Sequence, residues 1–264
     1  MKRIYSILLI LMLVCIGCQW QLRPNDADED AHTTGIQRYD RIENLYLTTG
    51  DFSALQQMNT SYPIQTRMLI EDVLHLGKVN DADINTKFLY FFQDSTLQQM
   101  LHDVQQQYAD MTDVAEELSE AVKRLHEEFP KLELPNVYTQ IGSFDQSIIV
   151  GAGTLGISLD KYLGKDYPFY KAHYTEEQRQ MMVRSMIVPD CLAFYILSQY
   201  PLDKKKRESQ SERNWHMGKI QWIVNRLTNR NVFENDHVKA VERYMANLSA
   251  TTFDQLLKAD IATD

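Results

Sequence analysis

Three glycines that follow an apolar run could form a nucleotide-binding loop. Gly151, Gly153 and Gly156 spell G-x-G-x-x-G directly after SIIV. A dinucleotide site needs a helix immediately after the glycines, because the N-terminus of that helix holds the pyrophosphate. The sequence that follows is ISLDKYLGKDYP, which alternates as a strand does and contains Gly164 and Pro168. We therefore predict that the glycines form a tight turn between strands and that the chain binds no nucleotide.

The histidines are potential metal ligands, but their spacing matches no known zinc pattern. No two of the seven lie four residues apart, as a helical zinc pair requires. A metal site would have to draw its ligands from scattered positions such as His173, His216 and Asp190, and this alternative stays open. We predict no catalytic, cofactor-binding or metal residues, and we expect no cofactor.

Cys15 and Cys18 close an N-terminal segment with the features of a secretion signal. A basic start precedes an apolar run from Ile4 to Ile16. As a helix this run would span only ~20 Å, less than the ~30 Å hydrocarbon core of a membrane. The segment ends in Cys-Ile-Gly-Cys, which resembles a bacterial lipobox with Cys15 in place of the usual leucine. We predict a signal peptide over residues 1–17 and lipidation of Cys18.

The remaining cysteine, Cys191, lies in an apolar stretch with a helical period. With Cys18 acylated, neither a disulfide framework nor a cysteine zinc site can form. A thiol inside an apolar helix is usually buried and inert, and we expect this of Cys191.

The chain after the signal peptide is strongly acidic. Loss of Lys2 and Arg3 from the 27 basic residues leaves 25 against 36 acidic ones, a net charge of −11. This charge argues against nucleic acid and anionic headgroups as general partners. Residues 25–35 are polar and acidic, and we predict a lipidated, flexible tether over residues 18–35. Gln19 rather than aspartate follows the lipidated cysteine, so we expect an outer-membrane lipoprotein that faces the periplasm or the cell surface.

The elements that would position these residues are mostly helices. Apolar residues recur three and four apart over residues 36–92 and again over 95–129, where we predict one long helix or two with a bend near Thr112. The period changes to that of short strands over residues 136–163. It becomes helical again from residue 175, and Pro189 should kink or divide the first helix there.

These patterns together predict an α+β fold that is mostly α-helical, with a small central β-sheet or hairpin. We expect one globular domain over residues 36–264, because about 225 residues can bury a sizeable core. Its parts are a helical N-terminal half (36–130), the strands (136–163) and a helical C-terminal part (175–260).

Three strings in the second half of the chain resemble the gliding-motility lipoprotein B family (GldB-like) of Bacteroidetes. They are ISLDKYLGKDYPFY at 157–170, Val-Pro-Asp at 188–190 and Gly-Lys at 218–219. The resemblance covers residues 130–225 most closely, and LDKYLG is its most specific part. It implies a cell-envelope lipoprotein that acts with an envelope protein partner in gliding, or in the related secretion and envelope machinery.

The layout of that family also resembles zinc peptidases in which a substrate-binding strand precedes a helix with H-E-x-x-H. This likeness implies a zincin-like architecture, that of a degenerate metallopeptidase or pseudo-peptidase. The helix expected in that position, QMMVRSMIVPDCLAFYILSQY, contains no histidine and no glutamate. We therefore expect a non-enzymatic accessory or assembly factor.

Two alternatives to this role remain. One is a metal-dependent hydrolase of zincin-like fold with non-standard ligands, and the other is a surface lipoprotein that binds a nutrient or a host ligand.

Overall fold

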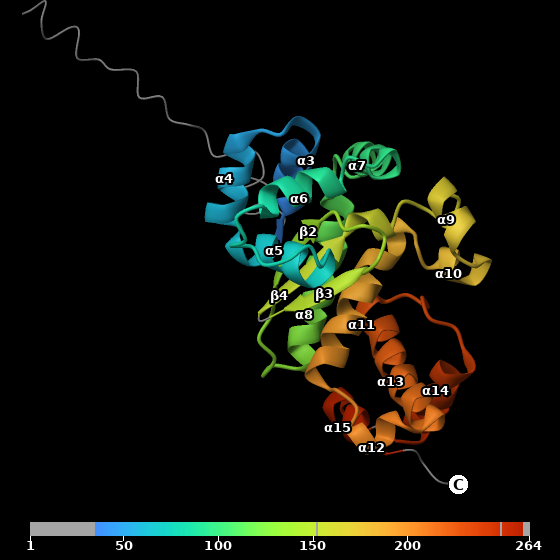
Figure 1. Ribbon diagram of the computed structural model, residues 1–264. Helices are drawn as coiled ribbons and strands as arrows, with labels where there is room; N and C mark the ends of the chain where they lie inside the picture. The colour runs from blue at the N-terminus through green and yellow to red at the C-terminus, as the bar shows by residue number, and fades with distance from the viewer. Residues whose placement is uncertain (1–34, 152, 249, 261–264) are drawn as a thin grey trace, which may run out of the picture.

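A four-stranded sheet lies at the centre of the structure, which is a computed structural model that describes residues 35–151, 153–248 and 250–260 (Figure 1). The strand order is β1–β2–β4–β3. The strands are β1 (Ile36–Gln37), β2 (Asn136–Gln140), β3 (Ile148–Gly151) and β4 (Thr154–Ser158). β1, β2 and β4 run parallel, and β3 pairs antiparallel with β4 at one edge. The prediction of a mostly helical α+β fold with a small central sheet is confirmed.

Most of the described chain is helical. The N-terminal part forms α3 (Tyr39–Thr49), α4 (Phe52–Ser61), α5 (Pro63–Arg67), the π-helical η1 (Met68–Val73), α6 (Ile84–Phe91), α7 (Ser95–Gln107) and α8 (Thr112–Glu128). The part after the sheet forms η2 (Leu159–Lys161), α9 (Pro168–His173), α10 (Glu176–Gln180), η3 (Arg184–Met186), α11 (Ile187–Gln199), α12 (Lys204–Arg207), α13 (Gln210–Thr228), α14 (Asp236–Asn247) and α15 (Phe253–Lys258).

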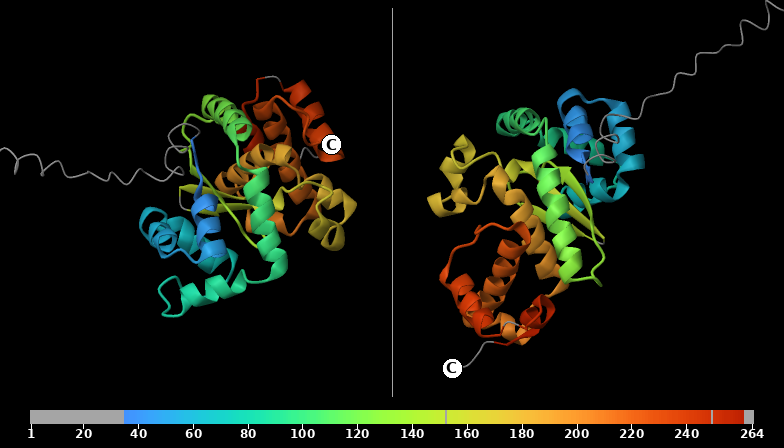
Figure 2. Two further views of the ribbon diagram at one scale, coloured as in Figure 1. Left: turned by 90° about the horizontal axis from the view of Figure 1, so that it is seen from above. Right: turned by 180° about the vertical axis from the view of Figure 1, so that it is seen from behind.

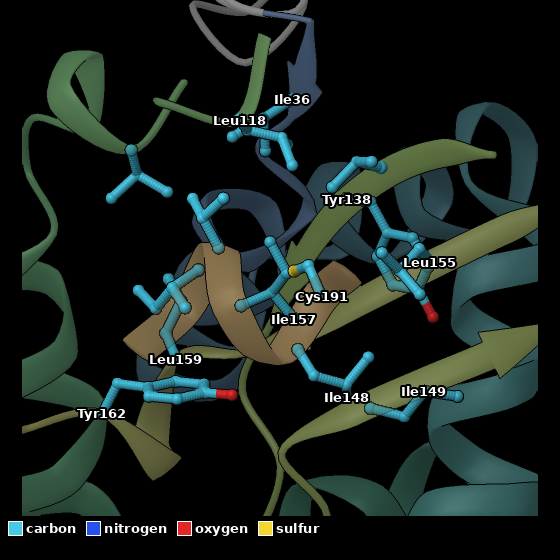
Figure 3. Packing of buried hydrophobic residues seen from close by; sticks show 14 of the residues in the cluster. Ile36, Leu118, Tyr138, Ile148, Ile149, Leu155, Ile157, Leu159, Tyr162 and Cys191 are labelled. Atoms are coloured by element: carbon cyan, nitrogen blue, oxygen red, sulfur yellow. The ribbon is translucent and has the colours of Figure 1, made fainter. Parts of the chain in front are cut away.

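One face of the sheet is covered by α8 and α11, which lie side by side when the molecule is seen from behind (Figure 2). Figure 3 shows Cys191 of α11 against Ile157 of β4, with Leu118 of α8 and Ile36 of β1 nearby. α11 is apolar on almost every side because it packs against the sheet, α8 and α13 at once. α8, by contrast, has one buried stripe and an exposed outer face.

The opposite face of the sheet packs against the N-terminal helices. Tyr138 of β2 lies edge-on to Tyr39 of α3, and its hydroxyl is 4.0 Å from the sulfur of Met68 in η1. One contiguous set of buried apolar residues extends from Ile36 to Leu257. Such a core is what a single domain over the described part of residues 36–264 would need. No helix in this part of the chain is long and apolar enough to span a membrane.

The structure corrects the predicted start of the first helix. Residues 36–37 form a strand and the helix begins at Tyr39, whereas the apolar period predicted helix from residue 36. Ile36 pairs with Val137, and a partner so distant in sequence leaves no trace in local periodicity. The predicted strand region is also shortened: it ends at Ser158 instead of residue 163, because residues 159–161 form a 3₁₀ turn.

Both of the long helical patterns are divided in the structure. The long pattern over residues 95–129 forms two helices, and the second begins at Thr112. Pro189 is the third residue of α11, where its missing N–H would have no intrahelical partner in any case. The predicted helix from residue 175 is divided into α10, η3 and α11, and the break lies ahead of Pro189, which stands in the first turn of α11.

Candidate functional site

Asp160, in the string LDKYLG, lies where the carboxyl ends of the parallel strands meet. Its Oδ1 accepts a hydrogen bond from the backbone N–H of Gly142 at 2.6 Å, and its Oδ2 accepts one from Phe144 at 2.8 Å. The side chain is completely buried. Burial raises the pKa of this carboxyl group, and the two backbone hydrogen bonds oppose that rise. Asp160 therefore anchors the loop that follows β2.

The neighbours of Asp160 bind the same region. Lys161 Nζ donates to the carbonyl of Phe144 at 2.9 Å and to the hydroxyl of Tyr174 at 3.1 Å. Tyr170 donates its hydroxyl proton to the carbonyl of Asp160 and accepts from the N–H of Leu163. The string that carries the family resemblance thus holds two loops together, one after each of two parallel strands.

Phe144 shows how tightly this loop is constrained. Its φ angle is +63°, in the left-handed region that residues with a Cβ seldom adopt. The conformation places its N–H on Asp160, while its ring stacks on Phe169 with 3.9 Å between ring centroids. The hydrogen bond and the stacked ring offset the cost of the backbone geometry.

Glu43 is a second buried carboxyl group at this edge, and it comes from α3. Its Oε2 accepts from the N–H of Ile141 at 2.8 Å. Its Oε1 is buried and has no hydrogen-bond partner among the described residues, and the same holds for Oε1 of Gln140. Burial raises the pKa of Glu43 well above its usual value, and the nearby acids Asp40 and Asp160 raise it further. We call Glu43 and Asp160 the carboxylate clamp, because together they bind three amides of residues 141–144.

Glu43 was missed by the sequence reasoning, although a signal for it exists. It falls four residues after Tyr39 and three before Tyr46, inside the apolar stripe of its helix. A carboxyl group in such a stripe must find buried donors, here the N–H of Ile141.

A cavity of 330 Å³ borders the carboxylate clamp. Ile141, Arg38 and Asp40 line it on one side, and Arg41 and Tyr108 also contribute to the wall. Arg38 Nη2 contacts Asp40 Oδ2 at 2.9 Å, and both side chains are 4% exposed. Ligands of open α/β sheets generally bind outside the carboxyl ends of parallel strands, so this cavity occupies the position expected of a small-molecule site.

The glycines form the hairpin between β3 and β4, as predicted. Gly153 has a φ of +73° in the turn. A Cβ on Gly156 of β4 would lie 2.6 Å from the side chain of Tyr138 of β2, so the ring of Tyr138 can lie over β4 only because this position has no side chain. Because a strand rather than a helix follows, no helix N-terminus is available to hold a phosphate.

The scattered metal ligands considered from the sequence occupy three separate environments. His173 packs against the ring of Phe169, and Nε2 of His216 is 2.8 Å from the carbonyl of Tyr200. Asp190 accepts from the hydroxyl of Tyr162 at 2.8 Å, and burial raises its pKa to about 6. Within residues 35–151, 153–248 and 250–260, no three His, Cys, Asp or Glu side chains are grouped so that they could hold a metal ion.

Of the cysteines discussed from the sequence, the structure describes Cys191. Cys191 is 1% exposed, and burial raises the pKa of its thiol, as expected of an inert core residue. Cys18, the predicted lipidation site, lies outside the described residues, as does the predicted signal peptide.

The Gly-Lys element connects the C-terminal helices. A Cβ on Gly218 would lie 2.9 Å from backbone atoms of His237, which lets α13 and α14 pack closely. Lys219 is 3% exposed, and its Nζ donates to the carbonyls of Leu257 and Ala259 at 2.9 and 2.6 Å. Burial lowers the pKa of this amine to about 8.

Fold and site together define a mostly helical α+β protein in which buried carboxyl groups bind the loop after a central strand. The family model described as gliding motility protein GldB matches residues 23–234, which is most of the chain. The chain therefore belongs to the GldB family of gliding-motility lipoproteins. No curated protein and no solved structure matches it.

Proposed function

We propose that this protein is a non-enzymatic lipoprotein of the cell envelope that serves as an accessory or assembly factor for gliding, secretion or envelope machinery. In this proposal a lipid on Cys18 holds it in the outer membrane, and the folded domain faces the periplasm or the cell surface and contacts an envelope protein. Membership of the gliding-motility family supports the assignment. A clean deletion in a motile host, scored for spreading and for export of secreted cargo, tests it. Unchanged spreading and export would refute it.

The burial and hydrogen bonding of Asp160 and Glu43 support a non-enzymatic role. Acids that could act in catalysis at the carboxyl edge instead accept from the backbone amides of Ile141, Gly142 and Phe144. A general base must reach the proton that it abstracts. Both side chains are 0% exposed, and three of their four oxygens are bound to this loop.

The lipid anchor on Cys18 can be tested separately from the assembly role. Labelling of cells with radioactive palmitate should mark the wild-type protein and leave Cys18→Ala unlabelled. Cys191→Ala is the matched control and should label as the wild type does. Equal labelling of wild type and Cys18→Ala would eliminate the lipid anchor and leave the assembly role to be judged by the deletion.

We also propose that the scaffold is zincin-like and has been reused for binding. The edge strand β3 comes before α11, which packs against the sheet, and this order supports the proposal because the resemblance implies a strand ahead of the helix in the peptidase position. Elemental analysis of the purified protein tests this reading against the metal-dependent hydrolase, since a stoichiometric metal would favour the hydrolase.

The cavity beside Arg38 favours the second alternative, a lipoprotein that binds a nutrient or a host ligand. It holds 330 Å³ and is lined by charged and apolar groups together, as small-ligand sites are. Protease treatment of intact cells would show whether the domain is exposed to such ligands. Full protection of the folded domain would exclude a surface role.

A further inference from the structure

A groove on the α8 side of the sheet is distinct from the carboxylate clamp. It measures 770 Å³ and lies between α8 and the segment that leads into β2. Its apolar lining comes from Ala115, Leu118 and Val122 on α8, from Leu134 and Pro135 on the segment, and from Val137 at the start of β2. Leu134 is 46% exposed, so part of the apolar lining is open to solvent.

The charged side chains that line this groove are all acidic. Glu116 and Glu120 line it from the outer face of α8, and both are exposed. None of the residues that line it is basic. Arg124, one turn further along, contacts Glu120 at 3.5 Å and also donates to the carbonyl of Leu227 on α13, so its side chain extends away from the groove. An occupant would therefore meet an apolar floor with an acidic border.

This charge decides between possible occupants. The chain's own residues 25–31 contain four acids and would be repelled by Glu116 and Glu120. A second copy would set one acidic border against another on a chain of net charge −9. An anionic lipid surface is disfavoured for the same reason. In a segment with apolar side chains between basic ones, the apolar side chains would contact the floor of the groove and the basic ones would pair with Glu116 and Glu120.

We propose that this groove binds a segment of a partner protein in which apolar residues are flanked by lysine or arginine. The proposal rests on the proposed function for the existence of an envelope protein partner. The groove itself is a property of the folded domain and can be measured without any cellular phenotype.

Two synthetic peptides with the same apolar centre, one flanked by lysines and one by glutamates, provide the probe. Each is labelled with fluorescein and titrated with the full-length lipidated protein in nanodiscs, with empty nanodiscs as background. The lysine-flanked peptide should bind about tenfold more tightly, as two new charge pairs allow. Binding of neither peptide, or of both equally, would overturn the proposal.

Charge reversal tests the border of the groove. Glu116→Lys combined with Glu120→Lys should reverse the preference toward the glutamate-flanked peptide. Glu127→Lys combined with Glu128→Lys changes the same net charge on the same helix outside the groove and should leave the preference as it is. An unchanged preference in the first double variant would place the peptide elsewhere.

A pair of leucines tests the floor. Leu134→Ser, which adds no charge, should weaken both peptides severalfold, while Leu248→Ser, which alters a leucine of similar exposure at 43%, should weaken neither. Because both leucines are exposed, neither variant threatens the fold. Failure of the peptides to bind would leave the deletion phenotype standing, so the two proposals can fail separately.

Discussion

The carboxylate clamp and Lys219 both bind backbone groups of irregular segments, but with side chains of opposite charge. At the sheet, Glu43 and Asp160 accept from backbone N–H groups of the loop after β2. In the C-terminal part, the amine of Lys219 donates to backbone carbonyls at the end of α15. Both bind irregular backbone that lacks partners of its own. The first holds a loop in the centre of the molecule, and the second holds the last helix against α13.

The two sites also respond to pH in opposite directions. The pKa values of Glu43 and Asp160 are raised by burial, so the stability they contribute is present at low pH and declines as pH rises through those values. The pKa of Lys219 is lowered to about 8, so its contribution is present above its unfolded pKa and is lost as pH falls through about 8. We expect the site at the sheet to contribute more to the free energy of unfolding than the site at the last helix, because it lies in the centre of the fold.

The largest effect is expected from Asp160→Ala. It leaves the N–H groups of Gly142 and Phe144 buried without acceptors and should lower the free energy of unfolding by about 3–5 kcal/mol. Urea denaturation measures the loss. Asp145→Ala, at an exposed position in the same loop, is the control and should change little. A loss below that of Lys219→Met would reverse the ranking of the two sites.

Lys219→Met should cost less, about 1–2 kcal/mol, because the end of α15 can open to water when the amine is absent. The effect should be local: hydrogen exchange in residues 253–259 should accelerate while exchange in the strands stays slow. The gap from wild type should widen between pH 8 and pH 10. Lys239→Met, at an exposed site on α14, serves as the control. Uniformly faster exchange would contradict a local role.

Asp190→Asn tests the effect of burying a carboxyl group that binds no backbone amide of another loop. Asp190 has a pKa of about 6 and is bound by the Tyr162 hydroxyl. A pKa raised in the folded state means stability that is lost as pH rises through about 6. The asparagine variant should therefore gain about 1–2 kcal/mol at pH 7.5 relative to wild type and little at pH 4. Thermal melts at both pH values measure this, and equal shifts would argue against burial as the cause.

Glu43→Gln should give the smallest change in stability, and it tests whether the carboxylate clamp needs the charge of Glu43. The amide oxygen can still accept from the N–H of Ile141, and the new amino group can donate where Oε1 has no partner among the described residues. Stability should rise by about 1 kcal/mol at pH 8 and stay near wild type at pH 4. A loss at pH 8 would mean that the charged carboxylate is itself required.

Local patterns in the sequence predicted most of the helices and the hairpin. The break before Thr112, one of two alternatives that the sequence left open, and the start of α11 two residues before Pro189 both depend on near neighbours. β1 was not predicted, because its strand character comes from pairing with residues about 100 positions away. The 3₁₀ turn that replaces the end of the predicted strand depends on Asp160 turning inward to the amides of residues 142 and 144.

The same distinction between local patterns and distant partners applies to the candidate site. LDKYLG could be singled out as a string, but its task could not, since the loop that it holds lies upstream in the chain. Glu43 was missed because its donor, Ile141, is brought near only by the fold. The lipidation of Cys18 and the zincin-like relationship stay predictions.

The short strand β1 sets how the domain would bear mechanical load. A pull on the chain ahead of Gly35 would reach the fold at residues 36–37, whose two backbone pairs with Val137 and Tyr138 would be sheared along the strand direction. Immediately behind them, the buried pair of Arg38 and Asp40 is joined to β2 through Thr139, and Arg38 also bonds the carbonyl of Tyr108. Under the proposed anchor at Cys18, drag on the domain would thus be resisted first by the sheet edge and then by this buried ion pair, before any helix is loaded.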